Sequence, residues 1–346
     1  MSADPRALAE EAATFQRRLA TALATLAQLP PVELATAPRE ALVRDGKTTL
    51  YRYRSLAKPA GGPPLLIVFA LVNRPTVLDL QPDRSLIRSL LAAGIDVYLL
   101  DWGTPDRGDR HLSLADYTLG YLHRAVERIR ADHGALDLLG VCQGGTLSLL
   151  YASLEPKRLR RLITMVTPVD FHTPENLLAK WVRGIDVDLL VDTYGNVPGE
   201  LLNFGFMSLM PFRLTLQKYL ALVDGADDPA QLQNFLRMER WLADSPDQAG
   251  TAFREFVRTF FHENRLLHGG ATVGGRAIDL KAVAMPVYNI YATQDHLVPP
   301  SASRPLRHLV GSRDYEELAF DGGHIGIYVS SRARAIPAAI AAWLSR

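Results

Sequence analysis

The string GVCQGG at residues 140–145 places a cysteine between glycines, directly after an apolar run at residues 136–139. A helix-like segment follows at residues 146–154. A sharp turn from a strand into a helix needs small residues beside its tip, because a side chain there would collide with neighbouring backbone. Such a turn exposes the Cys142 side chain, and the helix N-terminus behind it stabilises a thiolate or an oxyanion. The string alone also fits a buried structural cysteine. Its position relative to the other elements of the chain must therefore distinguish a catalytic from a structural cysteine.

Length and charge exclude several classes of protein. The 346 residues are enough for an α/β core with one large insertion. Lysine and arginine number 38 and aspartate and glutamate 37, so no basic surface for nucleic acid is expected. The single cysteine excludes a disulfide within the chain and is typical of a reducing compartment. We find no secretory signal and no transmembrane segment in the sequence, and therefore expect a cytoplasmic protein.

Residues 1–38 are predicted to form an amphipathic helix followed by a linker. Apolar residues recur there at steps of three and four, at Leu8, Ala12, Phe15, Leu19, Ala22, Leu23 and Leu26. Prolines 30, 31 and 38 then indicate a linker. Two interpretations stay open: the apolar face packs on the protein's own core, or it contacts a partner subunit or another apolar surface.

Strand and helix patterns alternate through the first half of the chain, which predicts a mostly parallel sheet with helices on both faces. We expect an edge strand at residues 49–54 and buried strands at 65–70, 95–101, 136–141 and 162–166. Helices are expected at residues 85–93, 114–130 and 146–154.

The alternation stops at residues 168–284, which predicts an inserted, mainly helical cap or lid. Helical patterns occur there around residues 177–181, 212–222, 232–242 and 253–261. Its many aromatic residues either form the insertion's own core or line an apolar channel or a dimer face. Strand patterns resume at residues 285–292 and 315–320, and a closing helix is expected at 334–344. The core is thus assigned to residues 39–167 and 285–346.

Two residues with ionisable side chains, an aspartate and a histidine, follow the last two predicted strands. Asp295 comes just after the strand MPVYNIYA and His324 just after YEELAF. The order nucleophile, acid, histidine is that of the α/β-hydrolase fold, and all three residues fall at the carboxyl edge of the sheet. Separately, Asp295 fits a solvated loop carboxylate and His324 a surface histidine. Together with Cys142 they predict a catalytic triad.

Backbone amides near this triad are expected to stabilise an oxyanion. In this fold the donors follow the nucleophile and an early strand, which indicates Gln143 and Val72. Asn73 and His296 are weaker candidates for substrate contact, because they only neighbour these positions in sequence. No spacing typical of metal ligands occurs, and no glycine loop for a nucleotide, so no metal and no cofactor are expected.

Long strings outside the elbow resemble one family. These are TPVDFHT at residues 167–173, GNVPGELLN at 195–203, PFRLTLQKY at 211–219, NFLRMERWLADSPDQAG at 234–250, DHLVPP at 295–300 and GGHIGIYVS at 322–330. With GVCQGG they resemble PhaC, the catalytic subunit of class III polyhydroxyalkanoate synthases, from about residue 40 onward. The family's cysteine, aspartate and histidine correspond to Cys142, Asp295 and His324.

The resemblance implies an acyltransferase that polymerises (R)-3-hydroxyacyl-CoA, chiefly 3-hydroxybutyryl-CoA, into polyhydroxyalkanoate. Coenzyme A would be part of the substrate and be released, with the growing acyl group held as a thioester on Cys142. It also implies a second synthase subunit, PhaE, a homodimer of the catalytic subunit, and association with polymer granules. Two alternatives remain: a cysteine-dependent thioesterase or ester hydrolase of the same fold, and a non-catalytic granule scaffold.

Overall fold

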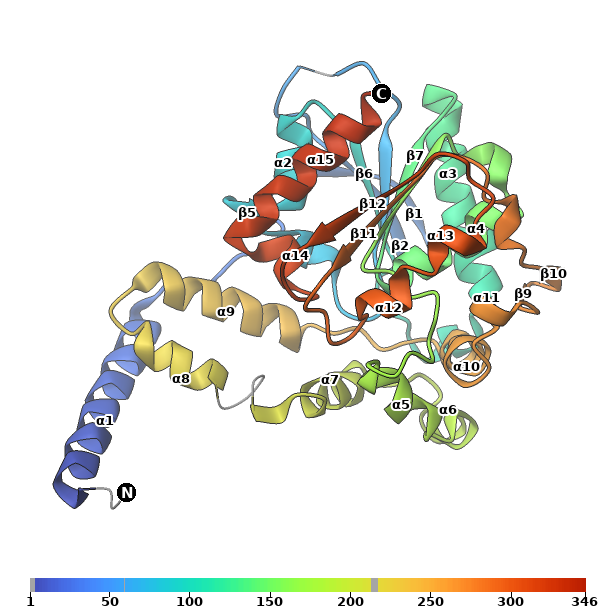
Figure 1. Ribbon diagram of the computed structural model, residues 1–346. Coiled ribbons are helices and arrows are strands. Elements are labelled where there is room, and N and C mark those ends of the chain that lie inside the picture. The colour runs from blue at the N-terminus through green and yellow to red at the C-terminus, as the bar shows by residue number, and fades with distance from the viewer. Residues whose placement is uncertain (1–3, 59, 213–216) are drawn as a thin grey trace.

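A twisted sheet of eight strands forms the centre of the computed structural model, which describes residues 4–58, 60–212 and 217–346 (Figure 1). The six strands from β6 to β12 run parallel, while β1 and β2 pair antiparallel at one edge. This confirms the expected mostly parallel sheet. In spatial order the strands are β1 (Arg39–Asp45), β2 (Thr48–Tyr53), β6 (Val97–Asp101), β3 (Leu65–Val68), β7 (Asp137–Val141), β8 (Arg161–Met165), β11 (Val287–Ala292) and β12 (Tyr315–Phe320).

The expected edge strand at residues 49–54 was wrong in one respect. It is β2, the second strand, and the edge is β1, which the pattern did not reveal. The sequence of β1, REALVRD, is half-buried and rich in charge, so it lacks the apolar run of an inner strand. Charged residues on an edge strand discourage pairing with other chains, which explains the composition.

Strand β3 is buried on both faces because its side chains alternate between two cores. Leu66 and Val68 face the core beneath α3 (His123–His133) and α4 (Gln143–Leu154). Leu65 and Ile67 face the core beneath α2 (Leu86–Ala92) and α15 (Ala335–Leu344). Figure 1 shows these helix pairs on opposite sides of the sheet. The continuous apolar run of β3 therefore follows from its central position.

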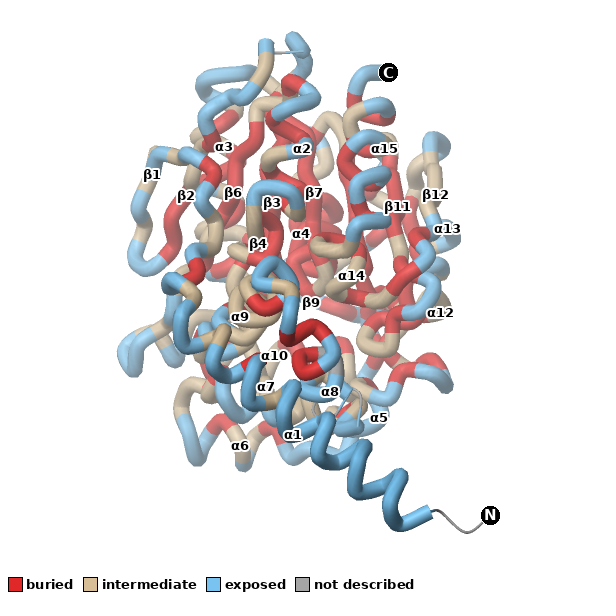
Figure 2. Tube along the Cα trace, turned by 90° about the vertical axis from the view of Figure 1, so that its left-hand side faces the viewer, coloured by how far each residue is buried: buried red, intermediate tan, exposed pale blue. Residues whose placement is uncertain are grey.

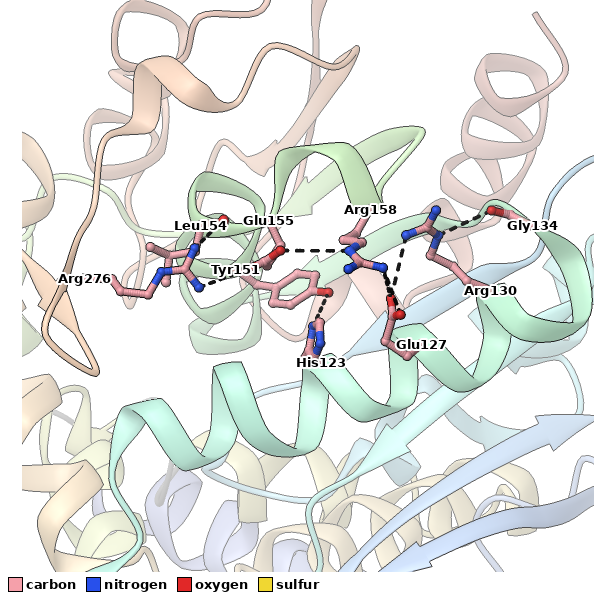
Figure 3. Close-up of polar contacts among 9 residues, drawn as sticks. All are labelled: His123, Glu127, Arg130, Gly134, Tyr151, Leu154, Glu155, Arg158 and Arg276. Carbon is pink, nitrogen blue, oxygen red and sulfur yellow. Dashed lines mark hydrogen bonds and ion pairs between the residues drawn. The ribbon is translucent and has the colours of Figure 1, made fainter.

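The helix expected at residues 114–130 has two parts. Residues Asp116–Leu122 form a π-helical segment, and α3 begins at His123. Figure 3 shows polar contacts around the end of α4. Arg158, in the turn after α4, donates to both oxygens of Glu127 in α3 at 2.8 Å, and Arg276, in a short strand at residues 276–277, pairs with Glu155 at 2.8 Å. These ion pairs are partly exposed, so each contributes at most about 1 kcal/mol.

Helices of residues 168–284 cover the carboxyl edge of the sheet as a cap (Figure 1). Phe171, Phe256 and Phe260 pack together as a buried aromatic cluster, whereas Trp181 and Phe204 are exposed. Of the helix expected at residues 212–222, residues 213–216 lie outside the described residues, and α8 covers the part from 217 onward. The helices α6, α7 and α11 were not foreseen. The cap helices are α5 (Leu177–Arg183), α6 (Val187–Tyr194), α7 (Gly199–Ser208), α8 (Gln217–Asp224), α9 (Pro229–Ala243), α10 (Gly250–Phe256), the π-helical η6 (Val257–His262) and α11 (Arg265–His268).

Helix α1 (Pro5–Gln28) projects away from the α/β core and packs against α8 and α9 of the cap (Figures 1 and 2). Asp4 caps its N-terminus, and only Ala22 is buried along its length. Leu8, Phe15 and Leu23 are exposed. The helix therefore packs on the protein's own cap along part of its length and leaves these apolar side chains exposed, so both alternatives remain open. Within the described residues, no helix is long and apolar enough to cross a membrane.

Short elements connect these layers. The strands among them are β4 (Asp79–Gln81), β5 (Arg84–Ser85), β9 (Thr272–Val273) and β10 (Arg276–Ala277). The helices are α12 (Pro300–Ser303), α13 (Leu306–Leu309) and α14 (Gly326–Val329). Single 3₁₀ turns are η1 (Pro75–Leu78), η2 (Arg107–His111), η4 (Pro156–Arg158), η7 (Leu280–Ala282) and η8 (Ser331–Arg334).

Helix α4 approaches β3 so closely that Gly144 has no room for a side chain. A Cβ there would lie 2.3 Å from the Val68 carbonyl oxygen and 2.4 Å from that of Phe69. We expect Gly144→Ala to lower the free energy of unfolding by about 3 kcal/mol, because backbone has to shift. The control Gly205→Ala, in α7 with open space around it, should change stability by less than about 1 kcal/mol. Denaturant unfolding measures both, and equal stability of the two variants would contradict the close packing.

Candidate active site

Cys142 occupies the turn between β7 and α4 in a strained conformation. Its φ is 54° and its ψ is −124°, a region that residues with a Cβ rarely adopt. Hydrogen bonds on both sides hold it there. The Cys142 N–H donates to the Met165 carbonyl at 2.8 Å, and its own carbonyl accepts from the Gly145 N–H at 2.9 Å. The turn lifts the half-buried thiol out of the sheet, at the N-terminus of α4.

Asp295 and His324 lie in the loops that follow β11 and β12, and their side chains meet. His324 Nδ1 and Asp295 Oδ2 are 2.6 Å apart, and both side chains are almost fully buried. The other oxygen of Asp295 accepts from the N–H groups of Leu297 at 2.8 Å and Val298 at 2.9 Å. Every oxygen of this buried carboxylate thus has a partner, which offsets its loss of hydration.

The imidazole of His324 also hydrogen-bonds the Cys142 side chain. Because Nδ1 faces Asp295, Nε2 is the nitrogen left for the thiol. Burial is the largest influence on the pKa of His324 and lowers it, but the charges of Asp295 and Cys142 and their hydrogen bonds prevail. The pKa therefore lies well above its ordinary value of 6.5. The structure brings together the three residues that the sequence selected, and the imidazole is strongly basic.

Gln143 connects the turn to the loop after β3. Its side-chain Oε1 accepts the Leu71 N–H at 2.9 Å, so that amide is occupied. The backbone N–H groups of Gln143 and Val72 have no hydrogen-bond partner within the described part of the chain. Gln143 is the first residue of α4, where an N–H has no partner inside the helix. These two amides are thus available to an oxyanion near Cys142.

The loop after β3 also holds the cap, which the sequence did not indicate. The Asn73 side chain, at a residue with φ of 60°, accepts a hydrogen bond from the Ser245 hydroxyl. The Arg74 carbonyl accepts from Trp241 Nε1 at 2.8 Å, and the Arg74 guanidinium lies 3.2 Å from Asp244. Asn73 is therefore occupied by the cap. Its partner lies about 170 residues away, so no spacing in the sequence reveals it.

His296, the other weaker candidate, lies half-buried beside Asp295 in the turn whose amides hold that carboxylate. Throughout residues 4–58, 60–212 and 217–346, no group of three or more histidine, cysteine, aspartate or glutamate residues is arranged to hold a metal ion. Tyr328, next to His324 in space, was missed by the sequence analysis. Its only signal is the spacing of four residues from His324.

Comparison with known proteins gives first the class and then the family. Residues 63–331 match the family described as the alpha/beta hydrolase fold. The chain is 52% identical to the poly(3-hydroxyalkanoate) polymerase subunit PhaC of Allochromatium vinosum, over 99% of this chain and 98% of that protein. It is 51% identical to the same subunit of Thiocystis violacea, over 99% and 97%, and 47% identical to that of Synechocystis, over 91% and 86%. The chain belongs to the family of PhaC subunits.

Solved structures agree at the level of the fold. A hydrolase from Pseudomonas aeruginosa matches 90% of this chain and 100% of its own length with a TM-score of 0.54 at 15% identity. A monoacylglycerol lipase from Paleococcus ferrophilus matches 86% and 98% with a TM-score of 0.50 at 19% identity. At these identities the likeness concerns the fold alone.

The raised pKa of His324 provides a test of the site. We expect Asp295→Asn to lower the pKa of His324, because the carboxylate's charge is the largest influence that raises it. NMR titration of protein with ¹³C-labelled histidine measures this pKa. The control is Asp321→Asn, which removes an exposed carboxylate from the loop that carries His324. A His324 pKa that stays the same in the Asp295 variant would contradict the assigned electrostatics.

Proposed function

We propose that this protein polymerises (R)-3-hydroxyacyl-CoA, chiefly 3-hydroxybutyryl-CoA, into a polyester with release of coenzyme A. The observation that carries the proposal is a cysteine on the nucleophile turn, hydrogen-bonded to a buried histidine, in a chain about half identical to PhaC polymerase subunits. Cysteine is chemically suited to this reaction. Exchange of one thioester for another keeps the acyl group reactive toward a hydroxyl, whereas serine would give a less reactive ester.

Loading would begin with transfer of the Cys142 proton to His324. The sulfur then attacks the thioester carbonyl, a new carbon–sulfur bond forms, and the bond to the CoA sulfur breaks. His324 returns the proton to the departing CoA thiolate. The amides of Gln143 and Val72 would stabilise the negative oxygen of the tetrahedral intermediate.

Elongation would use the 3-hydroxyl of one unit as the nucleophile on the thioester of another. The new carbon–oxygen bond of the ester forms, the carbon–sulfur bond of the thioester breaks, and the departing thiolate receives the hydroxyl proton through His324. His324 has the high basicity that this proton transfer needs, and Asp295 lies 2.6 Å from it. We assign Asp295 a role in this step beyond orientation of the imidazole. Water has to be kept out, since hydrolysis would end the chain. The cap, attached through Asn73 and Arg74 to the loop beside the site, suits this role and would have to shift to admit substrate.

Removal of the sulfur tests the covalent mechanism. Cys142→Ala should release no detectable CoA from 3-hydroxybutyryl-CoA, and intact wild-type protein should carry the acyl group on the peptide that contains Cys142. Mass spectrometry locates the group without ambiguity, because the chain has one cysteine. Insoluble polymer as the product supports the synthase, free hydroxybutyrate supports a hydrolase, and failure of Cys142 to react with a thiol reagent supports a scaffold.

Asp295→Asn separates loading from elongation. We expect this variant still to acylate Cys142 in a single turnover, but to extend the polymer about a hundredfold more slowly, because the deprotonation of the hydroxyl loses its carboxylate. CoA release followed over the first and later turnovers measures the two phases. Acylation blocked as completely as in Cys142→Ala would contradict the elongation role.

We further propose that the apolar face of α1 binds the second synthase subunit, PhaE. On this face Ala22 is buried, since the helix packs on α8 and α9, but the apolar side chains of Leu8, Phe15 and Leu23 are exposed. Exposed residues of the cap, among them Phe204 and Leu189, would serve a homodimer or the surface of a cytoplasmic polymer granule.

Substitution on α1 tests the partner surface. Joint replacement of Leu8, Phe15 and Leu23 by glutamine should weaken the affinity for the second subunit at least about tenfold, because the apolar contact area is lost. Titration by calorimetry measures it. Leu56→Gln is the matched control, since Leu56 is an exposed leucine outside α1 and the cap. Unchanged affinity in the triple variant would exclude α1 as the contact.

A further inference from the structure

Tyr328 is a buried tyrosine in α14 whose hydroxyl has no hydrogen-bond partner among the described residues. Its ring meets that of His324 edge to face, with centroids 6.5 Å apart and planes at 88°. On another side it meets Phe69, at 6.4 Å and 69°. Figure 1 shows α14 between the sheet and the cap. A buried hydroxyl without a partner is uncommon, because it loses its hydration without compensation, and it calls for an explanation.

The position of this hydroxyl relates it to the reaction. Burial is the largest cause that raises the pKa of Tyr328 well above its ordinary value, and negative charge on Cys142 and Asp295 adds to it. The group thus stays protonated at neutral pH and remains a hydrogen-bond donor. Its ring packs on that of His324, the residue that hydrogen-bonds the thiol. Phe69, on which the ring packs, leads into the loop that carries the Val72 amide. Tyr328 therefore borders the place where an acyl group on Cys142 would begin.

An acyl group on Cys142 has two polar atoms near the sulfur. The carbonyl oxygen would accept hydrogen bonds from the backbone amides of Gln143 and Val72. The next polar atom of a 3-hydroxyacyl group is the oxygen on its third carbon, three bonds from the carbonyl carbon. Neither the triad nor the amides provide a dedicated donor for this second oxygen, whereas the Tyr328 hydroxyl is an unused donor.

We infer that the Tyr328 hydroxyl binds the oxygen on the third carbon of the acyl group and thereby selects 3-hydroxyacyl groups over acyl groups without that oxygen. This inference rests on the proposed function and adds a specificity-determining residue to it. A site that offers a buried hydrogen-bond donor disfavours an analogue that lacks the acceptor, since the donor is then left unpaired.

A water molecule is the competing partner for the hydroxyl. Tyr328 also lines a small cavity with the hydroxyl-bearing residues Ser85, Ser89 and Ser330. The Ser330 hydroxyl is itself buried without a partner among the described residues. A water bound there would satisfy Tyr328 without any influence on substrate choice, so the two partners give different kinetic outcomes.

The test compares acylation by 3-hydroxybutyryl-CoA and by butyryl-CoA, which differ only in the oxygen at the third carbon. Single-turnover CoA release and the mass of the Cys142 peptide report acylation in the full chain with its second subunit. We expect the wild type to prefer the hydroxylated substrate by about tenfold, the effect of one hydrogen bond. In Tyr328→Phe the preference should fall to about one, chiefly through slower acylation by 3-hydroxybutyryl-CoA.

Tyr151→Phe is the matched control. It removes the hydroxyl of another buried tyrosine, which lies in α4 and hydrogen-bonds His123 of α3 at 3.1 Å (Figure 3). Its preference should equal that of the wild type. The melting temperature of Tyr328→Phe should be at or above that of the wild type, because the substitution removes an unpaired hydroxyl and keeps the ring.

Each outcome decides the inference. A wild-type preference near one overturns it whether or not the variant folds, and so does an unchanged preference in Tyr328→Phe, which would assign the hydroxyl to water. If both Tyr328→Phe and Tyr151→Phe lose the preference for 3-hydroxybutyryl-CoA, the inference is also overturned, since the effect would then not be specific to the Tyr328 hydroxyl. If the wild type itself releases no CoA from 3-hydroxybutyryl-CoA, the proposed function fails first and the inference fails with it.

Discussion

The strained turn at Cys142 is the constraint on which the remainder of the site depends. Its positive φ reverses the chain between β7 and α4, and this reversal requires that α4 pack closely against β3. Gly144 permits that packing, because even a methyl group would overlap two carbonyl oxygens of residues 68 and 69. The same turn presents the thiol, leaves the Gln143 amide without a helical partner, and brings the Gln143 side chain onto the loop after β3. One backbone conformation thus sets several parts of the site.

The buried pair of Asp295 and His324 is the second feature that determines the geometry of the site. Its stability depends on a hydrogen-bond partner for each oxygen of the carboxylate. A carboxylate in this position would be costly without the two amides and the imidazole that it binds. With them, its charge keeps the imidazole basic despite burial. The arrangement combines a dry site with a strong base, a combination needed by chemistry that must transfer protons and exclude water.

Local patterns predicted the inner strands well, because each is covered on both faces and reads as an unbroken apolar run. β3, with the sequence LLIV, is the clearest example. The half-buried edge strand β12 was also found at residues 315–320 as expected, but in other places the pattern failed where burial is partial. β1 is half-buried and charged, the π-helical stretch before α3 keeps helical periodicity, and the short helices α6 and α7 have mixed surroundings. In these places tertiary contacts outweigh local preference.

The sequence by itself determined the fold class, the family and the positions of Cys142, Asp295 and His324, because each is tied to a local motif at the end of a strand. Only the tertiary structure decided that their side chains meet, that Asn73 and Arg74 hold the cap, and that α1 packs on the cap while Leu8, Phe15 and Leu23 stay exposed. The physical reason is distance along the chain. Contacts between residues that lie tens to more than a hundred positions apart arise from how the layers pack, and they leave no period or spacing in the sequence.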